Sequence, residues 1–202
     1  MENLYLIVGL GNPGSEYEKT RHNAGFLVTD RLAERWHVAW KAGKKFRARL
    51  ARKQSEGQDL LLCQPQTFMN FSGESVAAVA GFYRIATPRL IVIVDDADLP
   101  MGELRLRPGG GAGGHHGLES VQEHLGTKEY ARLRVGIGRQ SAARQITGHV
   151  LGRFDSTETV LLDTVLTAAC KQVETWIAAG IQKAMNQFNG AVIGAESEGN
   201  KQ

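Results

Sequence analysis

The chain has 202 residues, a length that predicts one compact domain rather than two small ones. Hydrophobic residues make up 42% of the sequence and charged residues 22%, the balance of a soluble globular protein with a sizeable core. The formal net charge is +3, so the overall charge alone does not indicate a nucleic-acid partner.

Strands and helices alternate along the chain. Short apolar or alternating runs predict strands over residues 4–8, 47–52, 60–63, 90–94 and 133–137. Apolar residues at steps of three and four predict helices over 23–36, 72–83, 116–125 and 156–179. Asp155, with Glu158 three residues later, resembles a capping box at the start of the last helix.

The run Leu90-Ile91-Val92-Ile93-Val94 is unbroken and rich in β-branched residues, which predicts a central strand covered on both faces. The alternation therefore predicts an α/β fold, in which a twisted mixed (mostly parallel) β-sheet is sandwiched between α-helices. We expect one globular domain over residues 1–190 and a polar, flexible tail over 191–202.

Basic residues gather in two parts of the sequence. From Arg31 to Lys53 there are nine Lys and Arg and one acidic residue, Glu34. A second basic set consists of Arg105, Arg107, Arg132, Arg134, Arg139, Arg144 and Arg153. Such sets suit a polyanionic partner, and a solvated charged face is the alternative interpretation.

The two cysteines, Cys63 and Cys170, lie far apart in apolar runs and fit no metal or redox spacing. We expect both side chains to be buried in a protein of the reducing cytoplasm. A strand begins almost at the N-terminus, so no cleavable leader is expected, and no apolar run is long enough to span a membrane.

Gly9-x-Gly11-x-x-Gly14 matches the dinucleotide-binding pattern and follows a predicted strand. That pattern requires a helix that opens immediately after the glycines, where its amides meet a pyrophosphate. Residues 14–19 have the composition of a loop instead, and the helical pattern begins only near Asn23. We therefore reject nucleotide binding as the primary interpretation.

His22 follows the glycine-rich turn, and Asp95 stands at the carboxyl end of the central strand, where α/β folds place their sites. A carboxylate that accepts the Nδ1–H of a histidine fixes its tautomer and makes the other nitrogen a better base. Asp96 and Asp98 crowd Asp95, but the spacing supplies too few His or Cys ligands for a transition metal. Mg²⁺ held by the carboxylates stays open as an alternative, although no phosphate motif stands beside it.

No Ser or Cys stands in a Gly-x-Ser-x-Gly nucleophile elbow, so we expect water activated directly by a histidine, without an acyl-enzyme. Asn12 and Asn70 are amides that can hold a carbonyl oxygen or an oxyanion, with turn and cap chemistry as the alternative.

The glycine-rich loop of residues 109–114 precedes a predicted helix, which favours a phosphate ligand. Arg105 and Arg107 precede this loop and, two residues apart on a strand, face the same side. A mobile loop without a ligand is the alternative.

These motifs together resemble the bacterial peptidyl-tRNA hydrolase family from Leu6 to about Phe188. The matching residues are 8–14, Tyr17, 20–25, 65–73, 95–100, 113–118 and 132–138. The resemblance implies a single α/β domain, a monomer, without a metal or cofactor, that cleaves the ester between a peptide and the terminal ribose of tRNA. Its partner is then peptidyl-tRNA, held at the acceptor end and along the peptide.

The resemblance also implies roles for individual residues. His22 is the expected general base on water, Asp95 its orienting carboxylate, and Asn12 the amide that distinguishes a blocked amino group from a free one. The expected contacts to peptide, terminal nucleotide and phosphate are Tyr17, Phe68, Met69, Asn70, Arg107, Gly113, His116 and Arg134.

One position departs from the family pattern, which usually reads Gly-Gly-His-Asn-Gly and here has His116 in place of asparagine. Histidine is larger and titrates, so we expect retained but altered activity. Two alternatives stay open: a non-catalytic RNA-binding relative of the same fold, such as the organellar splicing factors, and a nucleotide-binding oxidoreductase built on Gly9, Gly11 and Gly14.

Overall fold

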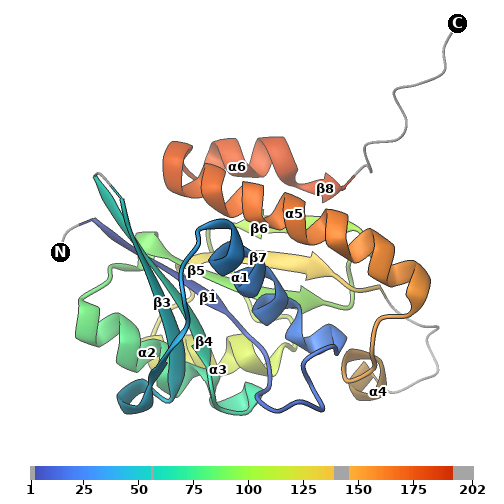
Figure 1. Cartoon of the computed structure of the whole chain (residues 1–202), viewed down its shortest axis with the longest axis horizontal. Coiled ribbons are helices and arrows are strands. Elements are labelled where there is room, and N and C mark those ends of the chain that lie inside the picture. The colour runs from blue at the N-terminus through green and yellow to red at the C-terminus, as the bar shows by residue number, and fades with distance from the viewer. Residues whose placement is uncertain (1–2, 56, 139–145, 193–202) are drawn as a thin grey trace, which may run out of the picture.

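The structure is a computed structural model that describes residues 3–55, 57–138 and 146–192 of the chain. Figure 1 shows one sheet with helices on both sides. The strands are β1 (Leu4–Gly9), β2 (Lys41–Gly43), β3 (Ala48–Ser55), β4 (Gln58–Pro65), β5 (Leu90–Asp96), β6 (Glu103–Arg107), β7 (Ala131–Gly136) and β8 (Gly190–Ala191).

The helices include all four that the spacing predicts. They are α1 (Ala24–Arg35), α2 (Ser72–Tyr83), α3 (His116–Leu125), α4 (Ile146–Val150), α5 (Ser156–Ala179) and α6 (Ile181–Phe188), with short 3-10 turns η1 (Arg21–Asn23), η2 (Lys44–Phe46), η3 (Met69–Phe71) and η4 (Thr87–Arg89). The sequence pattern did not predict β2, β8, α4 or α6.

The sheet has the strand order β2-β3-β4-β1-β5-β7-β6-β8. The central strands β4, β1, β5 and β7 pair in parallel, whereas the pairs on either side of them are antiparallel. The expected mixed sheet is therefore confirmed, with its parallel part at the centre, where both faces are covered. It is not mostly parallel, since three strand pairs are parallel and four are antiparallel.

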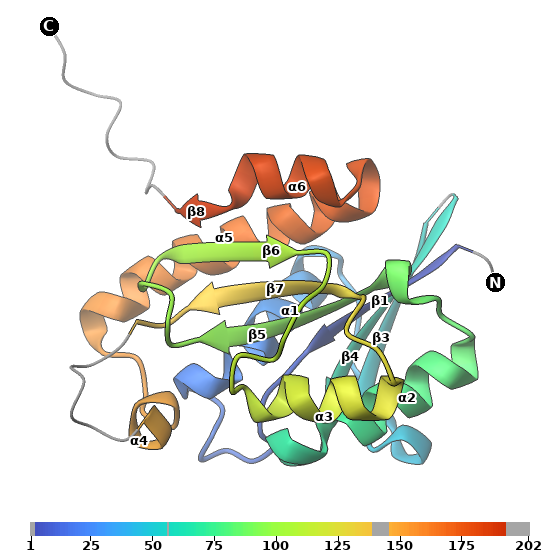
Figure 2. The same ribbon diagram turned by 180° about the vertical axis from the view of Figure 1, so that it is seen from behind.

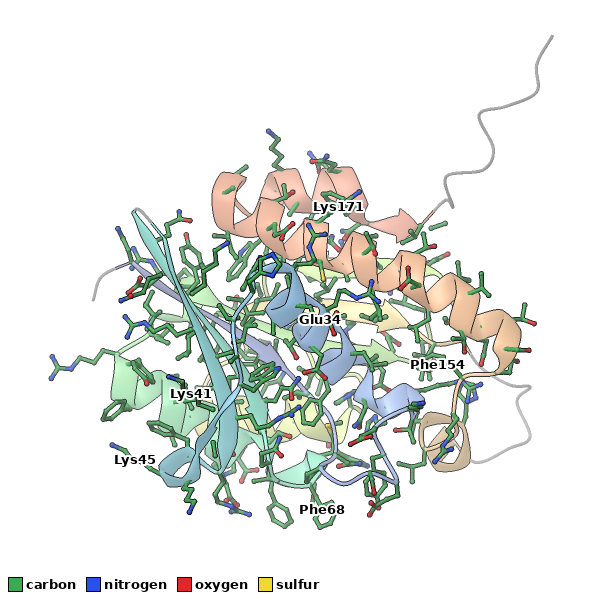
Figure 3. The ribbon with its side chains drawn as sticks, viewed as in Figure 1. Glu34, Lys41, Lys45, Phe68, Phe154 and Lys171 are labelled. Carbon is green, nitrogen blue, oxygen red and sulfur yellow. The ribbon has the colours of Figure 1, made fainter. Side chains whose placement is uncertain are left out.

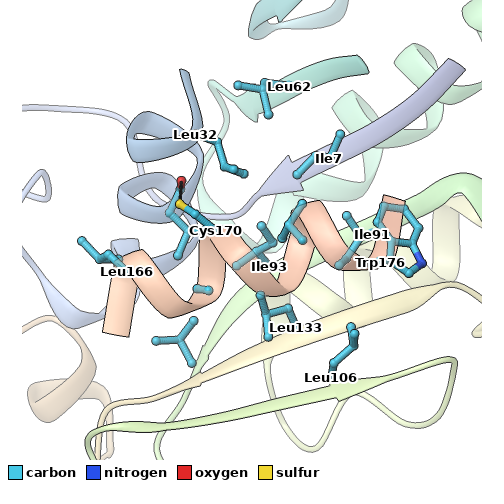
Figure 4. Close-up of a cluster of buried hydrophobic side chains, with 14 of the residues drawn as sticks. Ile7, Leu32, Leu62, Ile91, Ile93, Leu106, Leu133, Leu166, Cys170 and Trp176 are labelled. Atoms are coloured by element: carbon cyan, nitrogen blue, oxygen red, sulfur yellow. Dashed lines mark hydrogen bonds between the residues drawn. The ribbon is translucent and has the colours of Figure 1, made fainter. Parts of the chain in front are cut away.

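Alternating residues of each central strand enter two separate cores. Ile7 and Ile91 pack with Leu32 of α1 and with Cys170 and Trp176 of α5 in one core (Figure 4). On the other face, side chains of the same strands pack with α2 and α3; they include Leu6, Val8, Val92, Val76 and Val121. Figure 2 shows α2 and α3 on this second face. Because helices pack against both faces, the carboxyl ends of the parallel strands lie in fixed positions along the same edge of the sheet.

The glycines of the dinucleotide-like pattern have packing and backbone roles. A Cβ on Gly9 would lie closer than 3.0 Å to the carbonyl oxygen of Gly25, and one on Gly11 would press on the ring of Phe26. Gly14 has a φ of +115°, which other residues rarely adopt. Because α1 begins only at Ala24, no helix opens at this turn, and the nucleotide-binding interpretation loses its structural basis.

Some of the expectations from the sequence concern the C-terminal tail and two arginines of the second basic set. Of the tail expected over 191–202, the structure describes Ala191, which ends β8, and Val192, whose N–H donates to the carbonyl oxygen of Gly102 at 2.7 Å. The rest of the tail, together with Arg139 and Arg144, lies outside the described residues. Within the described part of the chain, no helix combines the length and the apolar character needed to cross a bilayer.

Candidate active site

A cavity of about 750 Å³ opens at the carboxyl edge of the parallel strands. The loop after β1 brings Asn12 and η1 brings His22, while the end of β5 brings Asp95 and Asp96. The remaining lining residues come from η3 and the loop before it, the loop after β5, the glycine-rich loop, the start of α3, β7, and the end of α4 with the residue after it; they are Phe68, Met69, Asn70, Ala97, Asp98, Gly113, Gly114, His115, His116, Arg134, Val150 and Leu151.

Two histidines share one carboxylate oxygen at the floor of this cavity. Nδ1 of His22 lies 2.9 Å from Oδ1 of Asp95, and Nε2 of His115 lies 3.1 Å from the same oxygen. The Asp95 side chain is 3% exposed and that of His22 is 14% exposed, so the carboxylate is buried while the imidazole borders the cavity. The expected pairing of His22 with Asp95 is present.

Hydrogen bonds fix the tautomer of His115. Its Nδ1 accepts from the backbone N–H groups of Gly117 and Leu118 at 3.1 and 3.3 Å, and so caps the N-terminus of α3. The ring proton must then be on Nε2, which donates to Asp95. With His22 donating from Nδ1 to the same oxygen, the Nε2 of a neutral His22 carries a lone pair toward the cavity.

The Asp95 carboxylate is held ionised by its partners. Burial acts to raise the pKa of this carboxyl, but the hydrogen bonds and charges of His115 and His22 outweigh burial and hold the pKa well below its usual value. A full negative charge therefore lies behind the two imidazoles, each of which contacts it through a ring nitrogen.

His22, Asp95 and His115 also bring three ligand-type atoms within 4.8 Å of one another. A metal at this point would need the Nε2 lone pair of His115, although its Nδ1 lone pair already accepts two amide protons. The ring would have to become an imidazolate, so the hydrogen bonds fit a proton-transfer site better than a metal site.

Asn12 is held as a directed donor. Its Oδ1 accepts from the backbone N–H of Met69 at 2.8 Å, which fixes the orientation of the amide. Asn23 braces the same residue, since its Oδ1 accepts from the Asn12 N–H at 2.8 Å and its Nδ2 donates to the Asn12 carbonyl oxygen at 3.0 Å. The Nδ2 of Asn12 makes no hydrogen bond within the described residues, and the side chain lines the cavity.

The glycine-rich loop is tied to the sheet by two arginines. Arg134 on β7 forms an ion pair with Asp96 at 3.1 Å and donates to the carbonyl oxygens of Gly111 and Ala112. Arg132 donates to Gly110 and Gly111 in the same way. Much of the hydrogen-bonding capacity of Arg134 is thus used within the protein, and the loop is an anchored wall of the cavity.

The expected site residues fall into two groups. Nine of them line the cavity: Asn12, His22, Phe68, Met69, Asn70, Asp95, Gly113, His116 and Arg134. Tyr17 and Arg107 do not line it; Tyr17 lies half-exposed in the loop before η1, and Arg107 is exposed on β6. Within the described part of the chain, Arg107 forms no ion pair.

His116 stands at the rim rather than on the floor. Its side chain is 76% exposed, and its Nδ1 lies 3.0 Å from a carboxylate oxygen of Glu119, one helical turn further along α3. A histidine here therefore adds a titratable group to the entrance and leaves the Asp95 pairs unchanged.

Sequence reasoning missed two residues of the site, His115 and Asn23. His115 stands at the N-cap of a helix that the pattern predicts correctly, which is the signal that could have found it. Asn23 was assigned only to the start of a helix. His115 acts through Asp95 at the end of β5, so its role depends on the tertiary packing, whereas Asn23 acts within the connection between β1 and α1 through Asn12.

Comparison with known proteins agrees with this geometry. The model of the family described as "Peptidyl-tRNA hydrolase" matches residues 6–197. The peptidyl-tRNA hydrolase of Gloeobacter violaceus is 45% identical over 95% of this chain and 97% of its own length, and that of Geobacillus kaustophilus is 46% identical over 91% and 98%. The crystal structure of peptidyl-tRNA hydrolase from Acinetobacter baumannii superposes with a TM-score of 0.88, at 41% identity over 95% of this chain and 97% of that one. The chain belongs to the peptidyl-tRNA hydrolase family.

Proposed function

We propose that this protein hydrolyses the ester bond of peptidyl-tRNA and so recycles tRNA released prematurely from ribosomes. The observation that carries the proposal is the hydrogen-bonded set of His22, Asp95 and His115 on the floor of a cavity that also presents a directed amide, Asn12. The reaction needs a general base, a hydrogen-bond donor for a carbonyl oxygen of the substrate, and room for both the peptide and the acceptor end of the tRNA. This cavity offers each of them.

His22 acts as the general base. Its Nε2 removes a proton from a water molecule while Nδ1–H donates to Asp95, whose charge stabilises the imidazolium that forms. The hydroxide attacks the ester carbonyl carbon, and the tetrahedral intermediate breaks the bond to the ribose oxygen. That oxygen leaves with the proton from His22, giving a free terminal hydroxyl on the tRNA and a peptide carboxylic acid, which releases its proton to water to become the carboxylate.

Asn12 supplies selectivity for a blocked amino group. Because Oδ1 accepts from the Met69 N–H, the amide is oriented so that its Nδ2 donors face the substrate. An acylated amino group presents a carbonyl oxygen that accepts such a bond, whereas the ammonium group of an aminoacyl-tRNA has no acceptor. The exposed aromatic ring of Phe68, with Met69 and Asn70, lines the wall along which the peptide and the terminal nucleotide lie.

The tRNA phosphates bind on the side of β6 and β7. Arg107 is exposed on β6 and opposes Arg132 of β7 in the sheet register, with Arg105 opposite Arg134. Since Arg134 already binds Asp96 and the loop, Arg107 is the better candidate for a phosphate contact. Gly113, His116 and Tyr17 complete the expected contacts around the cavity mouth. We further propose that the protein acts as a monomer in the cytoplasm, as expected for the family.

Hydrolysis of N-acetyl-aminoacyl-tRNA tests the function directly. The wild-type protein should release free tRNA and leave unblocked aminoacyl-tRNA largely intact, and His22→Ala should abolish turnover. A protein that binds the tRNA without cleaving it would instead be the non-catalytic RNA-binding relative. Arg107→Ala should weaken tRNA binding with a reduced salt dependence and leave kcat unchanged.

A further inference from the structure

The positive charge of the chain is concentrated in one segment whose Lys and Arg side chains have no role in the proposed reaction. Residues 41–89 contain nine Lys and Arg and three Asp and Glu, a net charge of +6, whereas the rest of the chain carries a net charge of −3. This segment covers the outer strands β2 and β3 and the helix α2, away from the two arginine-bearing strands β6 and β7.

Aromatic rings lie among these cations at the C-terminal end of α2. Phe82 is 54% exposed, and the Nζ of Lys45 lies 3.6 Å from the centre of its ring. Tyr83 meets Phe82 edge-on at 5.0 Å between ring centres, and buried Phe46 lies 5.3 Å away. The ring of Phe82 is therefore supported from within while about half of its surface stays open to solvent.

A groove adjoins the rings. Lys41, Arg52 and Tyr83 line a cavity of about 490 Å³ together with apolar side chains of β3 and β4. No residue of this groove lines the active-site cavity. We name the surface formed by Lys41, Lys44, Lys45, Arg52, Phe82, Tyr83 and Arg84 the cation–aromatic patch.

Most cations of this patch are uncompensated. Arg52 pairs with Asp59 at 2.5 Å, but Lys41, Lys44, Lys45 and Arg84 form no ion pair among the described residues. Nearby Arg47 is neutralised by Glu74, which marks the edge of the patch. An exposed ring beside several free cations fits a ligand that is both polyanionic and flat.

We propose that the cation–aromatic patch binds single-stranded RNA at a site separate from the catalytic cavity. The lysines and arginines contact successive phosphates, and an unpaired base stacks on Phe82 beside Lys45. A duplex keeps its bases stacked on one another and offers nothing to the ring, and an acidic protein segment would use the charges alone. Because α2 has 12 residues, its length of roughly 18 Å separates the patch from the end of the helix beside the cavity.

Fluorescence anisotropy of a labelled 12-nucleotide oligouridylate titrated with the full-length protein tests this proposal. The double variant Lys45→Ala/Phe82→Ala should weaken binding by roughly tenfold or more. The matched control Lys171→Ala/Lys183→Ala removes two exposed lysines from α5 and α6 and should leave binding unchanged. Figure 3 shows Lys45 and Lys171 on well-separated parts of the molecule.

Two further variants separate stacking from charge. Phe82→Trp should retain binding, and the fluorescence of the introduced tryptophan should be quenched when a base of the RNA stacks on it. Phe82→Leu should lose affinity for RNA without a change in the salt dependence of binding. Lys45→Ala should lower the slope of log affinity against log salt by about 1. Circular dichroism checks that each variant is folded; because Phe82 and Lys45 are exposed, their substitution should not change the spectrum.

Other results overturn the proposal. The first two are that the control Lys171→Ala/Lys183→Ala weakens binding as much as Lys45→Ala/Phe82→Ala does, and that Phe82→Leu binds as tightly as the wild type. The third such result is that an RNA duplex or oligoglutamate displaces the labelled oligonucleotide as well as unlabelled single-stranded RNA does. The outcome is independent of the proposed hydrolysis, since Lys45→Ala/Phe82→Ala should keep the wild-type kcat on N-acetyl-aminoacyl-tRNA.

Discussion

At the scale of single residues, the site depends on one carboxylate oxygen that accepts two imidazole N–H groups. Asp95→Asn keeps the size of this side chain but removes its charge, and it brings an amide N–H donor next to the two imidazole N–H donors. We expect kcat on N-acetyl-aminoacyl-tRNA to fall by about 100-fold with little change in KM, because the imidazolium loses its stabilisation only as it forms. Steady-state kinetics check this result, with thermal unfolding as the folding control. A kcat within threefold of the wild type would contradict the role of Asp95.

The ionisation of the site predicts the form of its pH dependence. Because the hydrogen bonds and charges of His115 and His22 hold the pKa of Asp95 well below its usual value, this carboxylate stays an anion from pH 5 to 8. Protonation of Asp95 should therefore cause no loss of activity in this range, and any decrease of log kcat/KM toward acidic pH should have a slope of one, because a single general base is at work. A profile of kcat/KM from pH 5 to 8 measures this slope, and a slope of two would mean that the carboxylate also takes up a proton.

His116 gives the entrance a residue that differs from the family pattern. Its side chain is exposed at the rim of the cavity and contacts Glu119, so any effect on the reaction should arise at the entrance. His116→Asn should raise turnover by more than about twofold if the histidine impairs water or substrate placement, and a tenfold gain corresponds to ~1.4 kcal/mol. Comparison of kcat for the two proteins decides the point, since a smaller change would show that the position tolerates either residue.

At the scale of elements, a buried ion pair joins the turn that carries His22 to the segment that walls the cavity. Arg21 is 6% exposed and binds Glu158 of α5, while its backbone N–H donates to the carbonyl oxygen of Gly152 at 3.0 Å. Val150 and Leu151 of the same segment line the cavity. The position of this wall therefore depends on Arg21, the residue next to His22.

Glu158→Gln tests this coupling because it removes the charge that compensates Arg21. We expect the free energy of unfolding to fall by roughly 3 kcal/mol and kcat/KM to fall with it. Asp163→Asn is the matched control: it removes a similar link from α5 to α1, but its partner Arg31 is 29% exposed and Asp163 itself 68% exposed. Denaturant unfolding should show that the control lowers the free energy of unfolding by less than about 1 kcal/mol. Equal decreases for the two variants would contradict a larger role for the Arg21 ion pair.

The elements predicted correctly from the sequence are those with strong local signals. Helix α5 begins with a complete capping box of Asp155 and Glu158, and α3 ends at Gly126 with a φ of +66°. The missed elements are short: β2 and β8 have three and two residues, and their pairing depends on partners far away in the sequence.

The same reasoning explains what the sequence could reveal of the site. His22 and Asp95 were found because each follows a strand that the pattern predicts correctly. His115 was not, because its role appears only when α3 is packed beside β5. Similarly, Asp96 looked like one of several crowded carboxylates, yet it is the ion-pair partner of Arg134.

At the scale of the whole molecule, the sheet divides the interior into two cores, and each contains one cysteine. Cys170 lies in the core under α1 and α5, and Cys63 lies in the core under α2 and α3. Both side chains are fully buried, and burial raises the pKa of each thiol to about 12. At pH 8 neither residue has an appreciable population of the reactive thiolate in the folded protein.

The two thiols therefore report separately on the two cores. Neither should react with a thiol reagent at pH 8 until denaturant unfolds the chain, and both should then become reactive at the same midpoint. A common midpoint is expected because the central strands supply alternate side chains to both cores, so that one core cannot open without exposing the other. Single-cysteine variants, Cys63→Ala and Cys170→Ala, allow each midpoint to be measured alone. If Cys63 reacted at a clearly lower denaturant concentration, the α2–α3 layer would unfold as a separate unit, and the sheet would not couple the two faces.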